Sequence, residues 1–114
     1  MNLTTYFKLI YIFFSISFFS CDKVEVPKDV SSCISKRIYT EKRKCLSKVI
    51  EYDYNGSIVY LFIPSGCPDG YYNLYNQNCE LICSPSGGIS GQGDGKCKDF
   101  FRVAIEKRTI WEKR

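Results

Sequence analysis

A β-hairpin dominates the pattern of apolar and polar positions in this 114-residue chain. Residues 48–63, KVIEYDYNGSIVYLFI, contain two runs rich in Ile, Val, Tyr and Phe on either side of Asn55-Gly56. Asn-Gly is the pair best able to hold two successive residues at positive φ, as the type I′ turn of a two-residue hairpin requires. The predicted register pairs Tyr54 with Ser57, Tyr52 with Val59, Ile50 with Leu61, and Lys48 with Ile63.

This register gives the hairpin two different faces, because side chains alternate along a strand. One face is apolar or aromatic throughout, and we expect it to face the core: Ile50, Tyr52, Tyr54, Val59, Leu61 and Ile63. The other face is mixed, and we expect it to be half covered: Val49, Glu51, Asp53, Ile58, Tyr60 and Phe62.

An amphipathic helix is predicted over residues 29–38, with Asp29 as its N-cap. The residues at helical spacing that indicate it are Val30, Cys33, Ile34, Arg37 and Ile38. Positive charge is concentrated toward and just beyond its C-terminal end, in Lys36, Arg37, Lys42, Arg43 and Lys44. A solvated helix end is the favoured interpretation of this charge, and contact with a membrane surface is the alternative.

A second hairpin and a second helix follow. Residues 71–76 and 79–83 read as two strands closed at Gln77-Asn78, in a register that places Cys79 and Cys83 on one inward face. Asp99 is the expected cap of a C-terminal helix through Ile105. The predicted fold is therefore α+β: one small disulfide-stapled domain over residues 29–114, with two antiparallel β-hairpins between an N-terminal and a C-terminal helix.

The first twenty residues have the features of an export signal. Lys8 precedes an uninterrupted run of apolar residues and Ser over residues 9–19, which is too short for a permanent membrane span. The run ends at Ser20-Cys21, which resembles the lipobox of bacterial lipoproteins. The resemblance implies that Cys21 is the lipidated first residue of the mature chain, followed by a tether over residues 21–28. An ordinary signal peptide is the alternative.

Seven cysteines and no histidine point to an oxidising compartment rather than to a metal site. Without Cys21 the remaining six can pair completely. Continuing the hairpin ladder outward places Cys45 opposite Gly66, so that Cys67 is close enough to bond it. Cys79 and Cys83 are too far apart on one strand to bond each other. Of the arrangements left, we favour a bond from Cys83 to Cys97, which closes the loop between them, and one from Cys33 to Cys79.

A glycine-rich stretch over residues 84–96, SPSGGISGQGDGK, is the most conspicuous candidate for ligand binding. Its spacing matches neither a P-loop nor a dinucleotide-binding fingerprint, and Asp94 lacks the neighbouring carboxylates of an EF-hand. A structural loop is the favoured interpretation. In the alternative, a ligand contacts Gly91, Gly93, Asp94, Gly95 and Lys96.

Enzymatic activity is not expected. The usual hydrolytic triads require a base that this sequence lacks beside any Ser or Cys. Glu51 and Asp53 lie two residues apart on one strand face, so a hydrolase acting through Asp and Glu alone is the exception to consider. The net charge of +4 is too small to indicate a nucleic-acid partner. No cofactor and no metal are expected.

Two resemblances bear on function. Cys67-Pro68-Asp69-Gly70, with Tyr75 and Cys79, resembles the Cys-x-x-Asp-Gly…Tyr…Cys core of Kazal-type protease inhibitors, although it is one residue short between Cys and Asp. Residues 45–111 resemble a family of small uncharacterised lipoproteins of the Bacteroidota type, through VIEYDYNGSIVYLFI, NCELICSPSGG, GQGDGKC-x-DF and Trp111. The second resemblance implies a cell-envelope location and brings no known activity.

We therefore expect a lipid-anchored, extracytoplasmic envelope protein that binds another macromolecule or has a structural role. Its expected partners are the membrane, through the acyl chains, and an envelope macromolecule that the sequence does not identify. A protease-inhibitor-like module that presents a disulfide-tied loop is the alternative.

Overall fold

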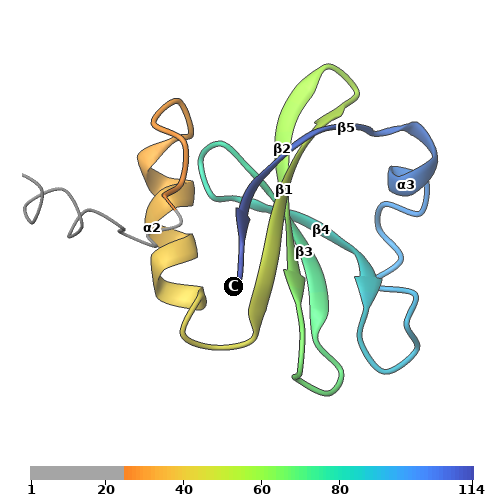
Figure 1. The fold of residues 1–114 in the computed structure, drawn as a ribbon. Coiled ribbons are helices and arrows are strands. Elements are labelled where there is room, and N and C mark those ends of the chain that lie inside the picture. Colours follow the sequence, from red (N-terminus) through yellow and green to blue (C-terminus); the bar gives the residue numbers. More distant parts are fainter. Residues whose placement is uncertain (1–24) are drawn as a thin grey trace, which may run out of the picture.

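Five antiparallel strands form one sheet in the computed structural model, which describes residues 25–114 (Figure 1). The strands lie in the order β4-β3-β2-β1-β5, so the hairpin of β1 and β2 occupies the middle of the sheet. Their bounds are β1 Leu46–Tyr54, β2 Ser57–Pro64, β3 Tyr71–Asn76, β4 Leu81–Gly87 and β5 Ile105–Glu112.

The central hairpin confirms the predicted turn and register. Asn55 and Gly56 have φ of 53° and 84°, and Tyr54 lies opposite Ser57. The pairing continues as predicted to Lys48 opposite Ile63. Beyond this point the straight ladder was wrong by one residue, because a β-bulge between Leu46 and Lys48 places Leu46 opposite Pro64.

Three of the six side chains on each face of the hairpin are buried. The mixed face is therefore half covered as predicted, but the expected core face is no more buried than the mixed one. The helix α2, Ser32–Glu41, covers the face that carries Val49, Tyr60 and Phe62. The opposite face, which carries Val59 and Leu61, packs against Phe100 of the short helix α3, Phe100–Val103. Figure 1 shows the two helices on opposite sides of the sheet. The sheet is therefore the middle layer of the domain.

The predicted C-terminal helix was wrong beyond its first turn. Helix α3 ends at Val103, the Ala104 N–H closes its last turn onto the Phe100 carbonyl, and Ala104 has an extended ψ of 143°. The chain then forms β5, which pairs along β1. The ladder satisfies backbone groups that would otherwise remain exposed at the edge of β1, and this long-range gain outweighs the helical spacing of the apolar residues.

The register of the second hairpin also differs from the prediction. The Asn76 side chain accepts hydrogen bonds from the N–H groups of Asn78 and Glu80, at 2.9 and 3.0 Å. This Asx-type turn lengthens the loop, so that β4 begins at Leu81 and Leu74 lies opposite Cys83. Cys79, with φ of 63°, lies outside the strand and packs with the α2 side of the core. Cys83 packs on the opposite side, so the two cysteines do not share a face.

Three disulfides connect these elements. Cys45 is bonded to Cys67, Cys83 to Cys97, and Cys33 to Cys79, with Cα–Cα distances of 5.7, 6.1 and 6.0 Å. These are the pairs that the register and loop arguments favoured. The described part of the chain is thus a small α+β domain in which every described cysteine is paired.

Candidate functional site

The glycine-rich loop folds back on β4 and uses its own polar groups to do so. The Asp94 carboxylate accepts hydrogen bonds from the N–H groups of Ser84 and Lys96, at 2.9 and 3.0 Å. The Asp94 N–H in turn donates to the Ser84 carbonyl at 2.9 Å. Hydrogen bonding, first from Lys96 and then from Ser84, holds the pKa of Asp94 below its usual range. The loop therefore covers part of the outer edge of β4. The hydrogen bonds of Asp94 hold the loop in this position.

Glu51 and Asp53 form hydrogen bonds that stabilise the fold, each with a different part of the sheet. Glu51 accepts hydrogen bonds from the Nε and Nη2 atoms of Arg108 on β5, at 3.3 and 3.2 Å. Asp53 accepts a hydrogen bond from the Gly56 N–H at 2.9 Å, within the type I′ hairpin. The structure therefore does not bring these two carboxylates together around a common reacting position.

The loop over residues 65–70 contains Cys67-Pro68-Asp69-Gly70, the first part of the Kazal-like pattern, and is hydrogen-bonded at both ends. The Ser65 N–H donates to the Cys45 carbonyl at 2.7 Å, and the Gly88 N–H donates to the Gly70 carbonyl at 3.2 Å. Residues 65–69 are exposed. Beside the loop lies a hollow of about 250 Å³ lined in part by Lys44, Phe62, Pro64, Cys67, Tyr71 and Asn73. Protease inhibition through this loop stays a prediction.

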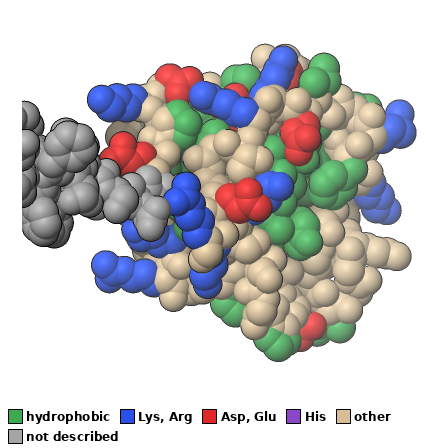
Figure 2. All heavy atoms as spheres, in the orientation of Figure 1, with side chains coloured by type: hydrophobic (Ala, Val, Ile, Leu, Met, Phe, Trp, Pro, Cys, Tyr) green, Lys and Arg blue, Asp and Glu red, His purple; other side chains and the backbone are tan. Residues whose placement is uncertain are grey.

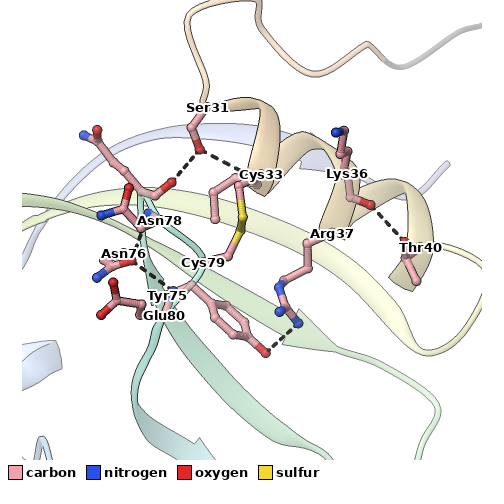
Figure 3. Close-up of a disulfide and its surroundings, with 12 residues drawn as sticks. Ser31, Cys33, Lys36, Arg37, Thr40, Tyr75, Asn76, Asn78, Cys79 and Glu80 are labelled. Carbon is pink, nitrogen blue, oxygen red and sulfur yellow. Dashed lines mark hydrogen bonds between the residues drawn. A yellow bond between two sulfur atoms is a disulfide. The ribbon is translucent and has the colours of Figure 1, made fainter.

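Helix α2 is held against the sheet by several contacts around the Cys33–Cys79 disulfide (Figure 3). Ser31, rather than the predicted Asp29, is the N-cap: its Oγ accepts a hydrogen bond from the Ile34 N–H at 3.4 Å and donates to the Gln77 carbonyl at 2.8 Å. Ser31 thus links the first turn of α2 to the loop that precedes Cys79. The outward face of α2 consequently has a defined orientation relative to the sheet.

Arg37 reaches from α2 to the sheet and belongs to this attachment. Its Nη1 donates to Glu41 at 3.3 Å and to the Tyr75 hydroxyl at 3.4 Å, and its guanidinium carbon lies 4.3 Å from the centre of the Tyr75 ring. Burial is the main reason why the pKa of Tyr75 is raised above its ordinary value. Of the predicted basic cluster, Arg37 therefore points to the core side and is not available to a ligand on the outer face.

The first described residues, 25–30, form what we call the N-terminal strap, which crosses beside α2. Val30 is buried in the core and Val26 packs against it. Asp29 accepts a hydrogen bond at 2.6 Å from Arg108, the same arginine that binds Glu51. The hydrogen bond to Arg108 lowers the pKa of Asp29, and the two carboxylates raise the pKa of Arg108. The strap is thus joined to both β5 and β1.

A groove of about 450 Å³ lies between the strap and α2, and we call it the strap groove. Its apolar lining comes from the strap and its polar lining mostly from the helix. The lining residues are Val26, Pro27, Lys28, Val30, Ser32, Ser35, Lys36 and Tyr39. All its charged lining residues are lysines. Within residues 25–114, neither Lys28 nor Lys36 forms an ion pair, and both are exposed.

The strap and α2 also carry the excess positive charge of the domain. Residues 25–44 contain six Lys or Arg and three Asp or Glu, whereas residues 45–114 contain eight of each. Figure 2 shows basic side chains gathered around α2. The sequence signalled this helix as basic, but it gave no indication that Lys28 of the predicted tether lines a groove with Lys36. We therefore take the strap groove and the outer face of α2 as the candidate site.

The comparison with sequence families covers most of the described domain. Residues 36–113 match the family described as domain of unknown function DUF6970. The chain belongs to this family. The DUF6970 region includes the whole sheet and most of α2, whereas the strap lies before it. No curated protein and no solved structure shows significant similarity to the chain.

Two further observations concern the described residues alone. Neither α2 nor α3 is long and apolar enough to cross a membrane. Residues 25–114 contain no group of three or more Cys, Asp or Glu side chains arranged to hold a metal ion. The predicted export signal and Cys21 lie outside the described residues.

Proposed function

We propose that this DUF6970 protein is an exported lipoprotein, anchored in a membrane of the cell envelope through Cys21. Its folded domain acts as a non-enzymatic binding or structural module on the extracytoplasmic side. Two or three acyl chains on Cys21 would provide a stable anchor, which a single chain would not. We also propose that the protein is related to the small uncharacterised lipoproteins of the Bacteroidota type that its sequence resembles.

The pairing of the cysteines is the observation that supports the proposal most. Six of the seven cysteines form three disulfides within the domain. Disulfides persist in oxidising compartments, which fits an exported protein. Cys21 is the cysteine that remains, and it stands where the apolar run of the predicted signal ends. An acyl-modified thiol accounts for an odd cysteine in a disulfide-rich exported chain.

The carboxylates that the sequence singled out for catalysis or ligand binding support a non-enzymatic role. Glu51 binds Arg108, Asp53 holds the hairpin turn, and Asp94 holds the glycine-rich loop against β4. Each acidic group therefore has a task in the fold that explains its position. None of the three needs a reaction to account for it.

Metabolic labelling with a palmitate analogue tests the anchor. The wild-type chain should incorporate the label, and Cys21→Ala should not. The double variant Cys33→Ala/Cys79→Ala is the matched control, because it also removes cysteines but leaves the lipobox-like sequence intact. It should be labelled like the wild type. Equal labelling of wild type and Cys21→Ala would refute lipidation at this residue.

A further inference from the structure

We propose that the strap groove and the outer face of α2 form the surface with which the domain docks onto anionic phospholipid. In this arrangement a lipid headgroup phosphate occupies the strap groove between Lys28 and Lys36. The inference rests on the anchoring proposed above, since the acyl chains would bring this surface to the membrane.

The groove provides the groups that a phosphodiester requires. The ammonium groups of Lys28 and Lys36 supply positive charge, and the hydroxyls of Ser32 and Ser35 supply hydrogen-bond donors. Val26, Pro27 and Val30 provide apolar surface beside them, which suits the boundary between a headgroup and its acyl chains.

Tyr39 extends this surface along α2. It is 51% exposed, and the Lys42 Nζ lies 4.4 Å from the centre of its ring. An exposed tyrosine beside lysines is suited to the membrane–water interface, because its ring is apolar and its hydroxyl is polar. The outer side of α2 thus presents basic groups and an aromatic ring together, which are residue types suited to an anionic membrane surface and its interface.

The length of chain before the strap places this surface near the anchor. Four residue steps separate Cys21 from Glu25, and they span at most about 14 Å when fully extended. The strap cannot swing freely from the domain, because Val30 is buried and Asp29 is bound to Arg108. The anchor therefore holds the strap side of the domain, rather than the glycine-rich loop, close to the lipid.

The charge distribution identifies anionic lipid as the partner. Residues 25–44 carry all the net positive charge of the described domain, and the sheet region is balanced. A lysine near an anionic membrane surface increases binding by about fivefold. With two lysines, Lys28 and Lys36, the equilibrium between docked and undocked domain should therefore be about 25-fold more in favour of docking on an anionic membrane than on a zwitterionic one.

Lysine acetylation read by mass spectrometry tests the orientation. The full lipidated protein is reconstituted in zwitterionic phosphatidylcholine vesicles and in vesicles that also contain phosphatidylglycerol, then treated with an uncharged acetylating reagent. Lys28 and Lys36 should react about fivefold or more slowly on the anionic vesicles. Lys98 is exposed and lies between Cys97 and Phe100, which pack on the face of the sheet opposite α2, so it should react equally on both.

Single charge reversals make the test specific. Lys28→Glu should restore the reactivity of Lys36 on anionic vesicles, and Lys36→Glu should restore that of Lys28. Lys98→Glu changes the net charge by the same amount and should leave both protected. These side chains are exposed, and retention of the fold is checked by the disulfide map of each variant.

Three results would overturn the proposal. Equal reactivity of Lys28 and Lys36 on both vesicle types would exclude docking through this surface. If Lys28 and Lys36 also lost their protection from acetylation in Lys98→Glu, the net charge of the domain, rather than this surface, would explain the protection. Protection by inorganic phosphate alone, with no further effect of anionic vesicles, would show a site for free anions. If the anchor itself is absent, the protein fails to float with zwitterionic vesicles, so the two proposals fail in distinguishable ways.

Discussion

The glycine-rich loop offers a matched pair of substitutions, Gly93→Ala and Gly91→Ala. Both glycines have positive φ, 73° and 74°, so both substitutions introduce the same backbone strain. A Cβ on Gly91 would meet no atom within 4 Å. A Cβ on Gly93 would overlap the Ser84 carbonyl oxygen and lie 2.7 Å from the Ser86 nitrogen. The two variants therefore differ in one feature, the close approach of the loop to β4.

The expected magnitudes follow from these contacts. An alanine in the left-handed region costs about 1–2 kcal/mol of folding free energy, and this applies to both variants. Alanine also lowers the entropy of the unfolded chain equally in both. Overlap with the backbone of β4 adds about 1–3 kcal/mol at position 93 alone, because neither the strand nor the closely bonded loop can shift without breaking hydrogen bonds. Gly93→Ala should therefore be the more destabilising variant by about 1–3 kcal/mol.

Urea denaturation with the disulfides intact measures the difference. With a slope of about 1 kcal/mol per molar urea, the two midpoints should differ by about 1 M or more. Amide exchange at Ser84 provides a second measurement, since its N–H donates to Asp94 and should exchange faster in Gly93→Ala than in Gly91→Ala. Equal midpoints and equal exchange would refute the role of this loop as a closely packed cover of the β4 edge.

Two other predictions follow from the turn and from the loop carboxylate. Gly56→Val places a β-branched residue at φ of 84° with open space around its Cβ, so the cost is backbone strain of about 1–3 kcal/mol; an unchanged denaturation midpoint would contradict the type I′ assignment. The pKa of Asp94 is lowered in the folded state, so its stabilising effect is complete above the ordinary aspartate value and is lost as the pH falls through the folded pKa. Stability should therefore decline below about pH 4 more steeply in the wild type than in Asp94→Asn, and identical acid profiles would argue against the hydrogen bonds to Ser84 and Lys96.

Local sequence determined the central hairpin almost completely. Asn55-Gly56 specifies the turn, and a two-residue turn fixes the register as far as Lys48 and Ile63. This register brings the segments of Cys45 and Cys67 together, and the bulge beyond it shifts the pairing by one residue without separating the two cysteines. Each step depends on residues that are close together in the chain. The two remaining disulfides were also favoured correctly, because excluding a bond between Cys79 and Cys83 left few alternatives.

Tertiary structure decided the elements whose partners lie far away in the sequence. The stretch from Phe100 to Ile105 has apolar spacing that suits a helix, yet only its first turn is helical, because β1 offers a second edge for hydrogen bonding to β5. Distant segments also decided how the hairpin is covered, since α2 packs on one face of β1 and β2 and Phe100 of α3 packs on the other. Neither outcome is encoded in the period of one segment.

The candidate site was visible in the sequence only as a basic helix. Its groove depends on the strap, whose position is set by Val30 in the core and by the bond from Asp29 to Arg108 across 79 residues of chain. Residue type and spacing indicate which groups carry charge, but they do not show which charged groups neutralise one another. Arg37 and Arg108 are engaged in the fold, while Lys28 and Lys36 line the groove, because packing brings each arginine beside carboxylates or an aromatic ring and leaves the lysines facing outward.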